Sequence, residues 1–165
     1  MNPTAIIVLV DLWRPETHTF HLRTGEMTVT LQDMSMILAL PIEGEPVCFD
    51  ADSSGGKNSS SWHQTVLSAI GKVPPVKKSV PASATYTWIA KEFGKCPEDA
   101  GKEVIEQHAR AYLWYVLSRT LFADGGGRTA SWIWLKALTG LERKSWGTAA
   151  LAYLYRQVIS CAYLA

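Results

Sequence analysis

Length, composition and charge already exclude several classes of protein. The chain has 165 residues, of which 47% are apolar and 19% charged, so it has room for one domain with a sizeable core. Its formal net charge of +1 at pH 7 provides no long-range field that would attract a polyanion, which argues against a DNA-coating role.

The first segment of the chain is short and apolar. Residues 6, 9, 10 and 13 are apolar and fall at helical spacing, with Thr4 as the candidate N-cap. The unbroken aliphatic run 6–10 is equally compatible with a strand, and both alternatives stay open. Pro15 ends the segment in either case, because proline disfavours helix at the residue before it. Asp11 interrupts the apolar run and no basic residue precedes it, so a signal peptide is not predicted.

Residues 20–31 alternate between apolar and polar side chains on both sides of a turn. The apolar positions are Phe20, Leu22, Met27, Val29 and Leu31. The turn is formed by residues 23–26, where Gly25 can take a positive φ at no steric cost. This period of two predicts a β-hairpin.

A capping box follows the hairpin directly. Thr30-Leu31-Gln32-Asp33 places a threonine and an acid at the spacing that satisfies the first amides of a helix. Met34, Ile37 and Leu38 then continue one face at helical spacing. We therefore predict a capped helix that Pro41 stops.

Two flexible loops are predicted, near residues 50–60 and 72–84. The first reads DADSSGGKNSS and is polar and rich in glycine and serine, whereas KVPPVKKSVP in the second is basic and broken by prolines. Between them, apolar residues at i, i+4 and i+8 from Trp62 to Ile70 predict a helix that ends at Gly71.

The second half of the chain predicts four helices. They span residues 86–93, about 101–122, 132–138 and 145–165; Gly94 and Gly140 end the first and third, and Ser145 caps the last. The last helix is apolar on nearly all sides, which predicts a central, buried helix. The expected fold is a single, mainly α domain over residues 1–165, with a small N-terminal β-hairpin leading into a capped helix.

A metal site is not predicted. His18 and His21 are separated by three positions, which in an extended strand places their side chains on opposite faces. Cys48 or Cys96 would complete a site only by coincidence of folding. The three cysteines, with Cys161, are far apart and odd in number, which favours a reducing intracellular compartment over a disulfide scaffold.

The sequence contains no recognisable catalytic motif either. GxSxG is absent, and residues 124–129 follow a predicted helix and lack the GxxxxGK[ST] spacing of a phosphate loop. A lysine that forms a Schiff base with a cofactor would need a cofactor-sized α/β domain, and the chain lacks the alternating βα pattern of such a domain. Lys91, Lys102 and Lys136 are therefore assigned to solvated helix surface. We therefore predict no cofactor and no enzymatic activity.

One group of residues is dense in polar and aromatic side chains. Trp13, Arg14, Glu16 and His18 lie within six positions, and Glu26 lies on the adjoining hairpin. Arg14 and Glu16 can simply pair with each other. The alternative is an exposed recognition edge for a protein partner, because tryptophan and arginine are enriched at interface hot spots.

Nucleic acid is the other partner considered. Lys77-Lys78 and Arg143-Lys144 are isolated basic pairs, and acids balance them along the chain. Five scattered arginines would support nucleic-acid binding only if the fold gathered them on one face: Arg110, Arg119, Arg128, Arg143 and Arg156. Ordinary surface charge is the simpler interpretation.

Four stretches of the sequence resemble the plant mobile domain family. They are LVDLWRPETHTFHLRTGEMTVTLQDMSMILALPIEGEPV, RAYLWYVLSRTLFADGGG, WIWLKALTGL and SWGTAALAYLYRQV, in that order. Family members act in meristem maintenance and in silencing of transposable elements, and some are transposon-encoded. The resemblance implies a nuclear, non-enzymatic protein that binds another plant mobile domain protein or a phosphatase-like relative. It implies no catalytic residue.

The chain departs from the family pattern at several positions. Ala39 stands where the family usually has glycine, Gly125-Gly126 where a serine–glycine pair is common, and Lys144 where an aromatic residue precedes SWG. The family domain is also longer at both ends, so we expect this chain to be a fragment of a larger all-helical domain. In that case apolar surface would be exposed around Leu151, Leu154 and Val158.

Overall fold

Helices dominate the structure, which confirms the mainly α prediction. The computed structural model describes residues 2–48, 59–75, 83–123, 126–139 and 144–162. Contacts divide the chain into two compact units, residues 1–47 with 143–165 and residues 48–142. The assignment of residues 1–165 to one domain stays a prediction.

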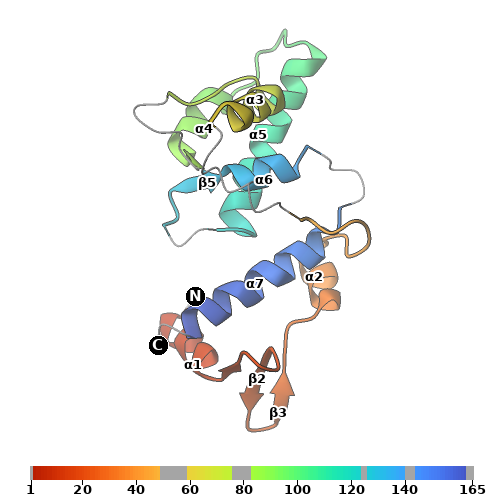
Figure 1. Cartoon of the computed structure of the whole chain (residues 1–165), viewed down its shortest axis with the longest axis vertical. Coiled ribbons are helices and arrows are strands. Elements are labelled where there is room, and N and C mark those ends of the chain that lie inside the picture. The colour runs from red at the N-terminus through yellow and green to blue at the C-terminus, as the bar shows by residue number, and fades with distance from the viewer. Residues whose placement is uncertain (1, 49–58, 76–82, 124–125, 140–143, 163–165) are drawn as a thin grey trace. The chain divides into compact units, whose positions relative to one another are not determined.

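The described residues of unit 1 form three helices and a three-stranded antiparallel sheet (Figure 1). The elements are α1 (Pro3–Asp11), β1 (Trp13–Arg14), β2 (Thr19–Leu22), β3 (Gly25–Met27), α2 (Leu31–Leu38) and α7 (Trp146–Ala162). The sheet order is β1-β2-β3, and α7 contacts α1, α2 and β1. The long last helix is therefore the element on which the short N-terminal elements pack.

The first segment is a helix and not a strand. Asn2 is its N-cap, with the side-chain Oδ1 accepting from the amide of Thr4 at 3.0 Å, so the assignment of the cap to Thr4 was wrong. Pro3 fits the first turn because its missing N–H would have had no partner there. The helix ends at Asp11, and Trp13 lies in strand β1, outside the helical face predicted for it.

The predicted hairpin is confirmed in β2 and β3. His21 faces Glu26 across the strands, and Gly25 has a φ of 128°, which the tight turn requires. Two details differ from the prediction. Residues 13–14 add a third strand, and β3 ends at Met27. The hydroxyl of the next residue, Thr28, donates to the carbonyl of His18 at 2.6 Å.

The capping box of α2 is also confirmed. Asp33 Oδ2 accepts from both the amide and the hydroxyl of Thr30 at 2.7 Å, and the amide of Asp33 donates back to Thr30 Oγ1. The hydroxyl bond first, and then the amide bond, hold the pKa of the Asp33 carboxyl below its ordinary value. The helix stops before the predicted Pro41. It ends at Leu38 because Ala39 turns left-handed, with a φ of 52°.

Helix α7 begins against the segment that follows α2. The amide of Gly147 donates to the carbonyl of Pro41 at 2.9 Å, and Ser145 Oγ donates to the carbonyl of Ile42 at 2.9 Å. Only its first turns, at Trp146, Gly147 and Ala150, are buried. The prediction of a central, buried helix was therefore wrong for the rest of α7.

Unit 2 holds four helices and a two-stranded sheet among its described residues. The elements are α3 (Ser59–Ile70), β4 (Ser83–Thr85), α4 (Tyr86–Phe93), α5 (Lys102–Thr120), β5 (Thr129–Ser131) and α6 (Trp132–Ala137). Helices are confirmed in the four regions predicted within this unit, at residues 62–70, 86–93, 101–122 and 132–138. Gly71, with a φ of 70°, follows α3 as predicted, and Gly94 caps α4; Gly140 and residues 163–165 lie outside the described residues.

The two predicted loops are shorter than expected. Residues 50–58 and 76–82 lie outside the described residues, but Ser59 already belongs to α3. At the end of the second predicted loop, Ser83 and Ala84 form strand β4, which pairs with β5. Three residues are too few to show the alternating pattern of a strand. The partner strand also lies more than forty positions away along the chain, so the local sequence does not indicate the pairing.

Aromatic side chains build the core of unit 2. The Trp114 indole is fully buried; its Nε1 donates to the carbonyl of Ser131 at 2.8 Å and its ring stacks on Trp132 with centroids 4.7 Å apart. Phe122 and Trp134 stack at 3.6 Å. Trp114, Trp132 and Trp134, three of the seven tryptophans of the chain, therefore pack within the fold.

Candidate functional site

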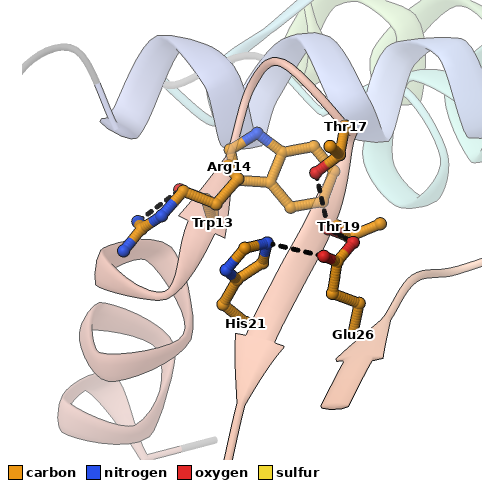
Figure 2. A network of polar contacts seen from close by, with 6 residues as sticks. All are labelled: Trp13, Arg14, Thr17, Thr19, His21 and Glu26. Carbon is orange, nitrogen blue, oxygen red and sulfur yellow. Dashed lines mark hydrogen bonds and ion pairs between the residues drawn. The ribbon is translucent and has the colours of Figure 1, made fainter.

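Four polar side chains form a connected network on the hairpin of unit 1. This hairpin cluster consists of Thr17, Thr19, His21 and Glu26 (Figure 2). His21 Nε2 lies 3.1 Å from Glu26 Oε1, Thr19 Oγ1 donates to Glu26 Oε2 at 3.0 Å, and Thr17 Oγ1 lies 2.7 Å from Thr19 Oγ1. The cross-strand register brings His21 and Glu26 together, because they are directly opposite one another.

The order of groups in the hairpin cluster does not suit nucleophilic catalysis. A Ser–His–acid triad needs the imidazole between the hydroxyl and the acid, so that the imidazole can take the hydroxyl proton. Here the Glu26 carboxylate lies between His21 and Thr19, and the threonine proton points at the carboxylate. The side chains of His21 and Glu26 are also 43% and 52% exposed, so the pair lies in solvent and not in an enclosed cavity.

Trp13 and His18 belong to a separate aromatic cluster. Trp13 is only 2% exposed; its ring meets Phe20 edge-on at 4.8 Å and Tyr155 at 5.4 Å. His18 has a φ of 54° and stacks on the Tyr155 ring at 5.5 Å. The two histidines considered for a metal site therefore lie in different environments, and His18 does not join the hairpin cluster.

Arg14 and Glu16 do not pair with each other. The Arg14 guanidinium donates to the carbonyls of Trp13 and Asp11 at 3.1 and 3.3 Å, whereas Glu16 is exposed and has no hydrogen-bond partner among the described residues. Of the five residues predicted to bind a partner, four are thus exposed. Trp13 is instead part of the core, where its ring packs against Phe20 and Tyr155.

Tyr155 also contributes to this region, although no sequence motif singles it out. Its hydroxyl donates to the carbonyl of Val29 at 2.5 Å and lies 3.0 Å from Thr28 Oγ1. The contact joins positions more than 120 residues apart, and an isolated tyrosine on an apolar helix carries no local signal of it. Tyr155 fixes the hairpin to α7.

A family model described as "Plant mobile domain" matches residues 1–162 of the chain. The chain belongs to the plant mobile domain family. The order of its motifs therefore reflects membership of that family and not a chance resemblance.

Relatives of this plant mobile domain are found in Arabidopsis thaliana. "Protein MAINTENANCE OF MERISTEMS" is 37% identical over 96% of this chain and 32% of its own length, and "Protein MAIN-LIKE 1" is 38% identical over 94% and 31%. "Serine/threonine-protein phosphatase 7 long form homolog" is 33% identical over 93% of this chain and 11% of its own length. The chain thus spans about a third of the first two. No solved structure matches.

Outside the hairpin cluster, the described residues of the plant mobile domain form few arrangements suited to catalysis or to binding a metal ion. Among the described residues, no three His, Cys, Asp or Glu side chains gather as ligands for a metal ion, and no helix is long and apolar enough to cross a membrane. Unit 2 has an open hollow of about 430 Å³ lined in part by Leu67 and Trp88. The ammonium of Lys72 in this hollow is already bound by the Glu92 carboxylate at 3.0 Å.

Two arginines of the plant mobile domain, Arg110 and Arg119 on α5, do not lie on a common face. Arg110 donates to the carbonyl of Ala69 at 3.0 Å and pairs with Glu106 at 3.2 Å, whereas Arg119 lies over the Tyr86 ring at 5.3 Å. Nine residues of α5 separate the two arginines, which is about two and a half turns and places them on opposite sides of the helix.

Exposed apolar side chains are the most unusual surface feature of unit 1. They occur on α1, at Ile6, Ile7, Val8 and Leu9, and on and after α2. We call the second group the α2 apolar surface, and it consists of Leu31, Met36, Ile37, Leu38 and Ile42. Leu151, Leu154 and Val158 are half-buried, so the expectation that they would be the exposed apolar area was wrong.

Proposed function

We propose that this plant mobile domain is a non-enzymatic protein–protein interaction module. Its partner is another plant mobile domain protein or a phosphatase-like relative, and it acts in the nucleus in meristem maintenance and silencing of transposable elements. The names of two relatives support this proposal, since one is called "Protein MAINTENANCE OF MERISTEMS" and another a phosphatase 7 long form homolog. The hairpin cluster supports the proposal further, because its polar side chains are bound to one another.

The exposure of α1 is the observation that carries the proposal. Ile6, Ile7, Val8 and Leu9 are consecutive and 44–60% exposed, so apolar side chains leave this helix on every side. No charged residue occurs between Pro3 and Val10. A helix that is apolar all round is normally covered by protein, and large exposed apolar surfaces mark interaction sites.

The exposed residues beside the sheet provide the polar part of the same interaction module. Arg14, Glu16, His18 and Glu26 are exposed, whereas Trp13 is buried. A polar rim around an apolar contact is the usual composition of a protein interface.

DNA binding is the less favoured alternative. It requires a positive stripe that neutralises several phosphates, and the paired Arg110 and the stacked Arg119 lie on opposite sides of α5. We expect no binding of duplex DNA at low salt. Salt-sensitive binding at micromolar concentration would favour this alternative.

Capture from plant nuclei tests the proposed function. The tagged chain should recover a plant mobile domain protein or a phosphatase-related subunit, identified by mass spectrometry. Ile7→Asp, which places a charge on α1, should reduce recovery at least tenfold. Ile105→Asp is the matched control, because Ile105 is exposed to a similar degree, 53%, but lies on α5. Recovery of nothing above background by the wild type would overturn the proposal.

A further inference from the structure

The α2 apolar surface is unusual because α2 is apolar on two sides. Met34 is buried on the side that contacts α7. On the outward side, Met36 and Ile37 are 76% and 77% exposed, the two largest values among the exposed large apolar side chains. The chain from Met36 to Ile42 has seven consecutive residues without a charge or a hydrogen-bonding side chain. Such a surface is too apolar to be explained as solvated helix surface.

The stretch of sequence that contains this surface is acidic. From Thr24 to Cys48 the sequence contains the acids Glu26, Asp33, Glu43 and Glu45 and no Lys, Arg or His. Glu43 follows Ile42 directly and has no hydrogen-bond or ion-pair partner among the described residues. Glu45 meets Lys144 at 3.4 Å but remains 77% exposed. The apolar run therefore has acidic neighbours.

We propose that the α2 apolar surface binds an amphipathic helix of a partner protein whose apolar stripe is flanked by lysines and arginines. The inference rests on the proposed interaction function and names the surface and the chemistry of the partner. Helices commonly dock through i, i+3 and i+4 apolar anchors on such surfaces. The exposed Met36 adapts to different partner shapes because its side chain is long, unbranched and polarisable.

The acidic neighbours decide between this occupant and two others. A second copy of the chain, packed through the same surface, would bring the acids of both copies together, and like charges across an interface are repulsive. An anionic membrane surface would be repelled in the same way. A basic-flanked helix instead gains attraction and faster association from Glu43 and Glu45.

Model peptides test the inference with the full chain. The probe is an 18-residue peptide of leucine and lysine at helical spacing, with a leucine–glutamate peptide and a serine–lysine peptide as comparisons, measured by fluorescence anisotropy. We expect the leucine–lysine peptide to bind at least tenfold more tightly than either comparison. Met36→Ser with Ile37→Ser should weaken that binding at least tenfold, and Glu43→Lys severalfold.

Two controls make the outcome decisive. Ile105→Ser on α5 should change the affinity less than twofold, and circular dichroism should show that the variants keep the wild-type helix content, since Met36 and Ile37 are exposed. Equal binding of the serine–lysine peptide, or wild-type affinity in the Met36→Ser/Ile37→Ser variant, would overturn the inference. So would concentration-dependent dimerisation that this double variant abolishes.

The failure of this inference is distinguishable from failure of the proposed function. If the wild type captures a nuclear partner and Met36→Ser/Ile37→Ser captures it equally well, the module function stands and the α2 surface is not its site. If the wild type captures nothing, the proposed function fails whatever the peptides do.

Discussion

Gly147 provides the sharpest test of how α7 is seated in unit 1. A Cβ at this position would lie 2.7 Å from Ile42 Cγ2, 3.3 Å from the carbonyl oxygen of Pro41 and 3.6 Å from Met34 Cβ. The first distance is far below van der Waals contact. Gly147→Ala should therefore force Ile42 away and weaken the hydrogen bond from the Gly147 amide to the Pro41 carbonyl.

Two opposing terms set the size of the effect. Replacing glycine by alanine inside a helix ordinarily stabilises by about 1 kcal/mol. Overpacking a close contact costs about 1–3 kcal/mol, and Ile42 is β-branched, so its Cγ2 methyl cannot rotate freely out of the way. We expect the clash to exceed the helix propensity, which gives a net loss of roughly 1 kcal/mol in the free energy of unfolding.

Urea unfolding followed by circular dichroism measures this loss, and two changes at Ile42 identify its cause. Ile42→Ala removes the clashing methyl, so Gly147→Ala in that background should be neutral or stabilising, with a coupling energy of about 1–2 kcal/mol. Ile42→Val keeps both γ positions occupied and should preserve the full loss. Additive effects of Gly147→Ala and Ile42→Ala, or stabilisation by Gly147→Ala alone, would refute the reasoning.

Three further predictions concern single side chains. Ala39 has a φ of 52°, so Ala39→Gly should raise the unfolding free energy by about 0.5–1 kcal/mol, whereas Ala109→Gly on α5 should lower it by a similar amount. Among the described residues, the buried Ser118 hydroxyl has no hydrogen-bond partner, so Ser118→Ala should raise the unfolding free energy by about 1 kcal/mol. Ser68→Ala is the control at an exposed hydroxyl and should change the unfolding free energy by less than about 0.5 kcal/mol. The pKa of Asp33 is lowered in the folded chain by its bonds to Thr30, so its carboxylate stabilises the fold above the ordinary aspartate pKa and this contribution is lost as pH falls through the lowered value. Asp33→Asn should therefore be less stable than the wild type at neutral pH in urea unfolding, and a difference that persists unchanged in strong acid would contradict this.

The elements predicted well from sequence are those with local physical causes. The Thr30–Asp33 capping box depends on two residues three positions apart, and α4 and α5 depend on apolar periodicity with glycine boundaries. The register of the hairpin follows from Gly25, whose positive φ determines the turn. In each case one short segment contains all of the information.

The features that were predicted wrongly depend instead on contacts between residues far apart in the sequence. Strand β4 exists only because β5 pairs with it, and Trp13 is buried because Phe20 and Tyr155 pack on it. The apolar character of α7 correctly predicted a helix, but not how much of it the neighbouring elements cover. Helical periodicity reports which side chains are apolar, and tertiary packing decides which of them become buried.

This difference also explains why the predicted site and the proposed partner surface are not the same. Polar and aromatic residues attracted attention in the sequence, yet Trp13 packs internally and His21 and Glu26 bind each other. A hydrogen bond satisfied within the chain leaves little free energy for a partner, because binding would have to replace it. The exposed methyls of Met36 and Ile37 have no such internal partner, and covering them is favourable with any complementary apolar surface. Exposed apolar side chains such as Ile37, which the helical spacing places on an apolar face, therefore favour association of unit 1 with a partner.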